Sequence, residues 1–332
     1  MAKNETLLMS RGAFIKSSAM VSASLLLGGC NFLGSQKKKQ KLSLSQWSLH
    51  RALFGNSKEN YSLWQEWLAT NPDKVLQGTL NSLDFPSVAK NTYGFNAVEY
   101  VNTFFYGKQE DYFNELKKRC DDVDVESLLI MVDEEGMLGD PSSEKRKESV
   151  ERHKKWLYNA AILGCHSVRV NAHSKGTKAE QQDYVIESLT ALCDLAKPLS
   201  LDIIIENHGG MSSEPNWLVD TIKKIDKPNL GTMVDFDNFK YSETKIWNGE
   251  LVYDRYEGVE LLMPYAKSVS AKSYSFDANG LEETVDYKRM VEIIEKSNFS
   301  NHISVEYEGE GEHSLNEKDG IFATKNLLER YI

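Results

Sequence analysis

Three acidic residues each lie near the end of an apolar run, where a carboxylate needs a partner. They are Glu206 in DIIIEN (202–207), Asp235 in LGTMVDF (230–236) and Glu306 in HISVEYE (302–308). Burying a carboxylate is costly unless a cation or a hydrogen-bond donor compensates its charge. If the three acids converge, a divalent cation with oxygen ligands is the simplest compensation. The alternative is that a lysine, an arginine or a helix N-terminus neutralises each acid separately.

The apolar runs alternate with amphipathic helical patterns from Leu42 to the end of the 332-residue chain. Ile203–Ile205 is typical of them, because so short an apolar run suits a parallel strand buried on both faces. The runs are LSLSQWSL (42–49), FNAVEYV (95–101), SLLIMV (127–132), SVRVNA (167–172), DIIIEN (202–207), LGTMVDF (230–236), SVSAKS (268–273) and HISVEYE (302–308). Eight β-then-α units predict a single-domain α/β fold over residues 42–332, a (β/α)₈ TIM barrel, whose catalytic groups lie at the carboxyl ends of the strands. A doubly wound open sheet is the alternative.

Residues 56–82 are longer than a minimal βα connection and form an insertion in the first βα loop. Trp64 and Trp67, together with Leu63 and Leu68, indicate an added helix. In a barrel, this insertion would sit at the catalytic end, where the βα loops gather. It would therefore either cover a substrate pocket or be a decoration without a role in binding.

The first thirty residues have the pattern of a targeting segment. Basic residues precede a short apolar stretch, Ala19–Leu27, and small residues lie directly before Cys30. This pattern resembles the lipobox of bacterial lipoproteins, which implies a signal peptide over 1–29 and a lipidated tether over 30–41. The protein is then expected on the bacterial cell envelope, on the periplasmic or outer-membrane face, held to the membrane through its lipid alone. A short membrane anchor with an incidental cysteine is the alternative.

Composition narrows the classes of partner. The net charge is −10, with 41% hydrophobic and 27% charged residues, which is ordinary for a soluble domain. An acidic chain argues against nucleic acid, since phosphate binding depends on clustered Lys and Arg. Cys120, Cys165 and Cys193 lack metal-type spacing, so buried free thiols are expected. The oligomeric state is left open.

The strand ends together resemble the xylose-isomerase-like TIM-barrel superfamily. The resemblance lies in E-N on the fifth run, D-x-x-N/H on the sixth, x-x-K on the seventh and V-E-x-E on the eighth. NAVEYVNTFF (96–105), with Glu99, and CHSVRVNAH (165–173), with Arg169, are also similar to the second- and fourth-strand patterns. That superfamily includes sugar isomerases and epimerases, inosose dehydratases and endonuclease IV.

The resemblance implies that Glu206, Asp235 and Glu306 bind a divalent metal. It also implies that Glu206 and Glu306 act as acid and base, moving a proton beside the carbonyl of a sugar or keto-sugar while the metal stabilises the developing charge. The expected function is an exported sugar isomerase or epimerase with a small carbohydrate substrate. The alternatives are a lyase- or hydrolase-type enzyme acting on keto-glycosides and a non-catalytic carbohydrate-binding lipoprotein. An endonuclease IV-like DNA repair enzyme is the least favoured.

Two residues depart from the superfamily pattern. Ser270 stands where members carry a seventh-strand histidine, and Asn238 stands where several carry a sixth-strand histidine. Without these imidazoles a multi-zinc cluster is disfavoured, and an all-oxygen site prefers Mg²⁺ or Mn²⁺ over Zn²⁺. His208 or His173 is a candidate replacement ligand. A weak metal site, or none, is left open.

Lys272 has the same strand parity as Ser270, so both are expected to face the barrel interior. A lysine beside three acids is a candidate catalytic residue that holds a substrate oxygen or transfers a proton. The alternative is that Lys272 only neutralises the carboxylates.

Four further polar residues are candidates for substrate binding: His208, Arg169, Glu99 and Asn238. His208 is otherwise a hydrogen-bonding loop residue, and Arg169 and Glu99 are each otherwise a member of a layer-filling ion pair inside the barrel. Trp47 is either a sugar-stacking surface or part of the core.

Overall fold

The protein is described here by a computed structural model that covers residues 40–332 except Asn248. The predicted signal peptide (1–29), the lipidation site Cys30 and nearly all of the tether lie outside the described residues. Within the described part of the chain, no helix is long and apolar enough to cross a membrane.

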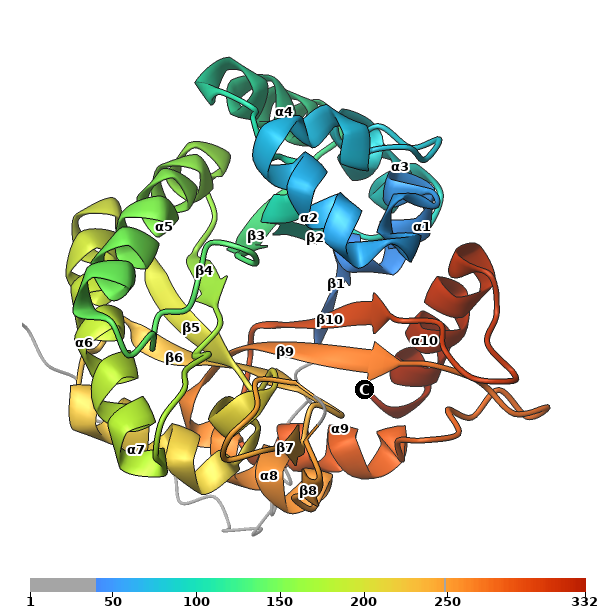
Figure 1. The fold of residues 1–332 in the computed structure, drawn as a ribbon. Coiled ribbons are helices and arrows are strands. Elements are labelled where there is room, and N and C mark those ends of the chain that lie inside the picture. The colour runs from blue at the N-terminus through green and yellow to red at the C-terminus, as the bar shows by residue number, and fades with distance from the viewer. Residues whose placement is uncertain (1–39, 248) are drawn as a thin grey trace, which may run out of the picture. The chain divides into compact units, whose positions relative to one another are not determined.

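Eight parallel strands close into a barrel, which confirms the predicted TIM barrel (Figure 1). They are β1 (Lys41–Ser45), β2 (Ala97–Val101), β3 (Glu126–Met131), β4 (Ser167–Val170), β5 (Asp202–Glu206), β6 (Leu230–Asp235), β9 (Ala266–Ser273) and β10 (His302–Tyr307). Their order around the barrel is β1-β10-β9-β6-β5-β4-β3-β2. The barrel closes where β1 pairs with both β10 and β2.

Helices surround the strands (Figure 1). They are α1 (His50–Phe54), α2 (Tyr61–Thr70), α3 (Phe85–Asn91), α4 (Glu110–Asp122), α5 (Ser143–Leu163), α6 (Lys178–Ala196), α7 (Pro215–Ile225), α8 (Arg255–Leu262), α9 (Tyr287–Lys296) and α10 (Glu317–Tyr331). Local signals set several of their ends. Thr177 and Glu180 form a capping box at the start of α6, and Gly164 adopts a left-handed conformation after α5, as expected for these residue types.

The first strand is shorter than predicted. We expected a strand over 42–49, but β1 ends at Ser45 and a 3₁₀ helix, Gln46–Leu49, follows it. The Ser45 hydroxyl accepts a hydrogen bond from the backbone N–H of Trp47 at 3.3 Å. This local bond starts a helical turn in place of further strand pairing, so Trp47 lies above the strand end.

The barrel interior has a polar side and an apolar side. Serines of β1, β9 and β10 are fully or nearly fully buried; they are Ser43, Ser45, Ser268, Ser270 and Ser304. Strands β3, β5 and β6 contribute Leu129, Ile204 and Met233, which are also fully buried. The larger apolar core lies between the barrel and its helices. Cys120, Cys165 and Cys193 are buried free thiols, as predicted.

Two loop segments extend beyond the carboxyl ends of the strands. The segment after β1 contains short 3₁₀ turns at Ser57–Glu59 and Pro72–Val75, with α2 between them. The segment after β6 forms a small antiparallel pair, β7 (Lys240–Tyr241) with β8 (Leu251–Val252). Both segments contribute side chains to the cavity at the barrel mouth.

Candidate active site

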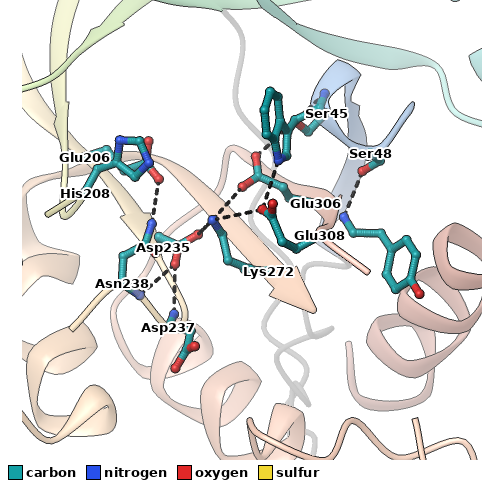
Figure 2. A network of polar contacts seen from close by, with 12 residues as sticks. Ser45, Ser48, Glu206, His208, Asp235, Asp237, Asn238, Lys272, Glu306 and Glu308 are labelled. Atoms are coloured by element: carbon teal, nitrogen blue, oxygen red, sulfur yellow. Dashed lines mark hydrogen bonds and ion pairs between the residues drawn. The ribbon is translucent and has the colours of Figure 1, made fainter. Parts of the chain in front are cut away.

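The three predicted acids converge at the barrel mouth. Glu206, Asp235 and Glu306 each offer an oxygen atom, and these atoms lie within 4.8 Å of one another. All three side chains are buried. Asp235 is oriented by its own loop, because its Oδ1 accepts hydrogen bonds of 2.9 Å from the backbone N–H groups of Asp237 and Asn238 (Figure 2). Burial raises the pKa of Asp235 to about 6, since desolvation disfavours the charged carboxylate.

Lys272 lies among the acids of the β6–β9–β10 side (Figure 2). Its Nζ is 3.2 Å from Glu306 Oε1, 3.7 Å from Glu308 Oε2 and 3.9 Å from Asp235 Oδ2. Burial opposes the charged ammonium, but the three carboxylates outweigh it and raise the pKa of Lys272 well above its usual value. Lys272 is therefore a protonated cation at neutral pH, and it is not a base.

Arg169 contacts two acids on the β3–β4–β5 side of the barrel mouth. Its Nε lies 2.9 Å from Glu206 Oε2, and its Nη1 donates a 2.7 Å hydrogen bond to Asp133 Oδ1. Burial raises the pKa of Glu206 to about 8, with Arg169 acting in the opposite direction. For Asp133, burial opposes ionisation, but the charge of Arg169 and the hydrogen bonds from Arg169 and Asn171 lower its pKa. Arg169 thus holds one acid in its charged form and stands beside a second that gains a proton near neutral pH.

The acid cluster fits a hard divalent cation. Glu206 Oε2 and Asp235 Oδ2 are buried and accept no hydrogen bond from the described residues. These two oxygens keep unused lone pairs, and carboxylate oxygens are the donors that Mg²⁺ and Mn²⁺ prefer. Lys272 stands close to the same oxygens, so a cation would have to share the acids with an ammonium. Ser270 has the place of the missing histidine but no imidazole. Its buried Oγ has no hydrogen-bond partner in the described residues.

Neither histidine that we considered as a replacement ligand joins the acid cluster, as far as residues 40–332 without Asn248 are concerned. His208 Nδ1 lies 2.8 Å from Asn171 Oδ1, and His173 Nε2 lies 2.8 Å from the His208 carbonyl oxygen. Asn171 also donates a 2.7 Å hydrogen bond to Asp133 Oδ1, which fixes its amide and makes His208 Nδ1 the donor. Burial lowers the pKa of His208 well below its usual value. His208 is thus a neutral cavity residue whose Nε2 carries no hydrogen.

Two residues predicted to bind substrate have other contacts. Asn238 is absent from the cavity lining and donates its amide hydrogen to Glu206 Oε1 at 3.1 Å, so it positions a carboxylate. Glu99 lies inside the barrel below the cavity and accepts hydrogen bonds from Ser43 Oγ and Ser268 Oγ, at 3.3 and 3.2 Å. Burial raises the pKa of Glu99 to about 8. Arg169 forms the ion pair considered for it, with Glu206 and Asp133, whereas Glu99 bonds to serine hydroxyl groups.

Four cavity residues were not identified as site residues from the sequence: Asp133, Glu308, Lys58 and Trp247. Two of them had a usable signal. Asp133 follows the third strand directly, and Glu308 has the same strand parity as Glu306. Lys58 and Trp247 lie in loops without periodicity, where no sequence pattern indicates which side chain faces a pocket.

A cavity of about 770 Å³ lies over the acids. Its lining includes six carboxylates: Asp133, Glu134, Glu135, Glu206, Glu306 and Glu308. Three cations also line it: Lys58, Arg169 and Lys272. Aromatic side chains complete the wall: Trp47, Tyr61, Trp64 and Trp247. Deep acids beneath aromatic walls are typical of a site for a polar small molecule with an apolar face.

Residues 88–330 match the family described as Xylose isomerase-like TIM barrel. The chain belongs to this family. The resemblance noted in the sequence is thereby confirmed, and the acid cluster at the carboxyl ends of the strands lies where TIM barrels place their active sites. Sequence comparison with curated proteins finds no match.

Solved structures of the same fold include several sugar-converting enzymes. D-psicose 3-epimerase from Clostridium cellulolyticum H10 aligns with a TM-score of 0.61 at 11% identity, over 88% of this chain and 99% of that one. The 3-keto-D-glucoside 4-epimerase of E. coli aligns with a TM-score of 0.60 at 15% identity, over 74% of this chain and 94% of that one. The IolI protein, solved with a bound zinc atom, aligns with a TM-score of 0.61 at 14% identity, over 88% and 99%. At such identities the likeness establishes the fold.

Proposed function

We propose that this protein is a carbohydrate-converting enzyme, an isomerase or epimerase that moves a proton on a carbon beside a carbonyl group. The observation that carries the proposal is the convergence of Glu206, Asp235 and Glu306 within 4.8 Å beneath a cavity with aromatic walls. A lyase that eliminates a group beside the carbonyl begins with the same proton abstraction. The two reactions therefore share this site.

Glu206 and Glu306 are the proposed acid and base. They stand on β5 and β10, which are separated by β6 and β9 in the ring of strands. The two carboxylates therefore reach a bound sugar from different sides. Lys272 and Arg169 each neutralise one of them and can donate hydrogen bonds to substrate oxygens. Positioned acid–base groups contribute about 10²- to 10⁴-fold to a rate.

Glu206, Asp235 and Glu306 are the residues that would hold a divalent metal, Mg²⁺ or Mn²⁺ in preference to Zn²⁺. When bound, such an ion supplies positive charge that stabilises an oxygen anion on the substrate. The protein supplies the rest: Asn238 and the backbone at Asp237 orient the ligating carboxylates, and the aromatic walls exclude water.

A carbohydrate-binding protein without chemistry is the second candidate. The observation that favours it is Lys272, whose ammonium already neutralises three acids at 3.2 to 3.9 Å. Metal content separates the two candidates, because purified protein that retains no Mg²⁺, Mn²⁺ or Zn²⁺ after reconstitution would favour binding alone. An endonuclease is disfavoured by six carboxylates against three cations in the cavity, since DNA carries a phosphate on every nucleotide.

Export and lipid anchoring through Cys30 are part of the proposal. The support is the sequence pattern before Cys30, which lies outside the described residues. Growth of the source bacterium with a radiolabelled fatty acid is expected to label the wild-type protein. Cys30→Ser is expected to remain unlabelled and to lose its membrane association, and labelling of that variant would contradict the assignment.

Solvent exchange tests the chemistry. Wild-type protein incubated in D₂O with ketohexoses and 3-keto-glucosides is expected to incorporate deuterium beside the carbonyl of its substrate, as followed by NMR. Glu206→Gln and Glu306→Gln are each expected to reduce that rate by at least 10²-fold. Glu66→Gln, an exposed change on α2, is the control. Exchange at the wild-type rate in either site variant would show that its carboxylate is neither acid nor base.

A further inference from the structure

Two exposed aromatic side chains line the cavity from two different loops. Tyr61, at the start of α2, is 48% exposed, and Trp247, between β7 and β8, is 49% exposed. The acids at the other end of the cavity are 5% exposed or less. The cavity therefore runs from buried carboxylates outward to exposed aromatic rings. Exposed aromatic rings beside a cavity are typical of ligand contacts.

The Tyr61 ring is held in place before any ligand arrives. Its hydroxyl donates a 2.6 Å hydrogen bond to Glu134 Oε1, and Gln65 Nε2 donates a 3.0 Å hydrogen bond to Glu134 Oε2. The ring also stacks on Trp64, with 5.7 Å between centroids. Through these two hydrogen bonds, Glu134 connects the insertion in the first βα loop to the loop after β3. A rigid aromatic surface loses little conformational entropy when a ligand binds.

Trp247 is placed by the turn that follows β5. Its ring packs edge-on against His173 and His208, with centroids 4.7 and 4.9 Å apart. Gly209 makes this approach possible, because a Cβ atom there would lie 2.8 Å from the Trp247 ring. The φ of Gly209 is +81°, a conformation that residues with a side chain rarely adopt.

Lys58 supplies an unused donor beside Tyr61. Its ammonium lies 4.4 Å from the ring centroid of Trp47 and 5.1 Å from that of Trp64. Lys58 lines the cavity, and the described residues give its ammonium no ion pair or hydrogen bond. Aromatic faces hold the charge in position while the N–H groups remain available to a ligand hydroxyl.

The volume of the cavity exceeds the needs of one sugar. At about 30 Å³ per water, 770 Å³ is the volume of about 25 waters, which is more than a hexose fills. The lining has more carboxylates than cations, so it is not a basic site of the kind that binds phosphates or uronic acids. The cavity therefore has room for a neutral ligand larger than one sugar ring.

We propose that Tyr61, Lys58 and Trp247 form an outer subsite that binds the second sugar ring of a neutral disaccharide, while the acid cluster receives the first ring. The apolar C–H face of the outer ring packs on the aromatic side chains, and its hydroxyl groups accept hydrogen bonds from Lys58. This subsite proposal rests on the proposed function in one respect: the inner ring is taken to be the one that the enzyme converts.

Calorimetric titration with unoxidised sugars tests the subsite without turnover. The probes are glucose, the α- and β-linked glucose disaccharides with 1→1, 1→2, 1→3, 1→4 and 1→6 linkages, and glucose 6-phosphate. At least one disaccharide is expected to bind at least tenfold more tightly than glucose, and glucose 6-phosphate more weakly than glucose. Disaccharides that all bind like glucose, or a phosphate ester that binds more tightly than glucose, would overturn the proposal.

Variants assign the gain in affinity to the outer residues. Tyr61→Ala and Trp247→Ala are each expected to weaken the best disaccharide by about tenfold and to leave glucose binding unchanged. Tyr61→Phe, which keeps the ring, is expected to retain most of the affinity. Tyr158→Ala is the control, because Tyr158 is 57% exposed on α5 and outside the cavity lining. Equal losses for glucose and disaccharide in both alanine variants would show that no separate subsite exists.

The two proposals fail in different ways. If disaccharides bind more tightly through Tyr61 and Trp247 but no keto-sugar exchanges deuterium, the subsite stands and the isomerase assignment falls. If keto-sugars exchange while every disaccharide binds like glucose, the isomerase assignment stands and the subsite falls.

Discussion

Arg169 and Lys272 neutralise acids on different sides of the barrel mouth, and their contacts differ. Arg169 Nη1 donates a 2.7 Å hydrogen bond to Asp133, and its Nε lies 2.9 Å from Glu206 without the geometry of a hydrogen bond. Lys272 lies 3.2 to 3.9 Å from three carboxylates and is directed by none of them alone. A guanidinium in short contacts is a fixed part of the structure, whereas an ammonium shared among acids can move at little cost. The Arg169 side is therefore the rigid half of the site, and the Lys272 side is the half that can accept another cation.

Removing Arg169 is expected to have the largest effect. Arg169→Met removes the cation beside buried Glu206 and beside Asp133, whose side chain is 24% exposed, so the free energy of unfolding is expected to fall by about 3–5 kcal/mol. Chemical denaturation measures this loss. Arg119→Met, which removes an exposed ion pair with Asp84, is the control and is expected to lose less than about 1 kcal/mol. A similar loss in both variants would show that Arg169 contributes no more to stability than an exposed ion pair does.

Glu99 lies in the barrel interior below the Lys272 side of the site, and its protonation can be tested through the pH dependence of stability. An unfolded chain releases the Glu99 proton near pH 4.5, whereas the folded protein keeps it until about pH 8. The unfolded state therefore binds fewer protons between these values, and wild-type stability falls as the pH rises. Glu99→Gln lacks this fall and still accepts hydrogen bonds from Ser43 and Ser268.

Relative to the wild type, Glu99→Gln is expected to become more stable as the pH rises. The difference in free energy of unfolding should grow by about 2 kcal/mol or more between pH 4.5 and pH 8, since one pKa unit corresponds to about 1.4 kcal/mol. Denaturation at several pH values measures the difference. Glu260→Gln, an exposed change on α8, is expected to show no such trend. A constant difference between Glu99→Gln and wild type would mean that Glu99 is ionised in the folded protein.

The smallest expected effect is that of Lys272→Met on the free energy of metal binding. This variant tests whether the Lys272 side of the site can accept another cation. Removal of a positive charge 3.2 to 3.9 Å from the acid oxygens is expected to tighten Mn²⁺ binding at least tenfold, because the two cations repel each other. Electron paramagnetic resonance of free Mn²⁺ measures the affinity. Lys267→Met is the control, since Lys267 pairs with Asp202 at the start of β5. Weaker Mn²⁺ binding in Lys272→Met would show that the lysine supports the metal site.

Much of the fold could be predicted from the sequence because each strand and helix carries its own periodic signal. The run Ile203–Ile205 and the capping residues Thr177 and Glu180 specify their elements locally, whatever lies across the barrel. The exception is β1, where the hydroxyl of Ser45 turns an extended pattern into a 3₁₀ helix. A run of alternating residues does not reveal a competing side-chain hydrogen bond.

The candidate site was predictable in part. Parallel strands bring their carboxyl ends to one mouth, so the meeting of Glu206, Asp235 and Glu306 followed from their places at strand ends. The partners of Arg169 and Glu99 did not follow, because an inward-facing residue can bond to a neighbouring strand or across the barrel, and only the register and shear of the closed sheet decide which. Asn238 shows the same limit, since its amide turns to Glu206 and away from the cavity.

By itself the sequence determined the barrel and the position of each of the three acids near the end of a strand, since strands and helices arise from residues that are close along the chain and repeat with a fixed period. The tertiary structure alone decided which acids Arg169 and Lys272 neutralise, how deep Glu99 lies and which loop side chains line the cavity. These outcomes depend on distances between strands and loops that are far apart in the chain, and electrostatic and packing energies change steeply over an ångström or two. Tyr61 and Trp247 are separated by nearly two hundred residues, yet closure of the barrel places both beside one cavity.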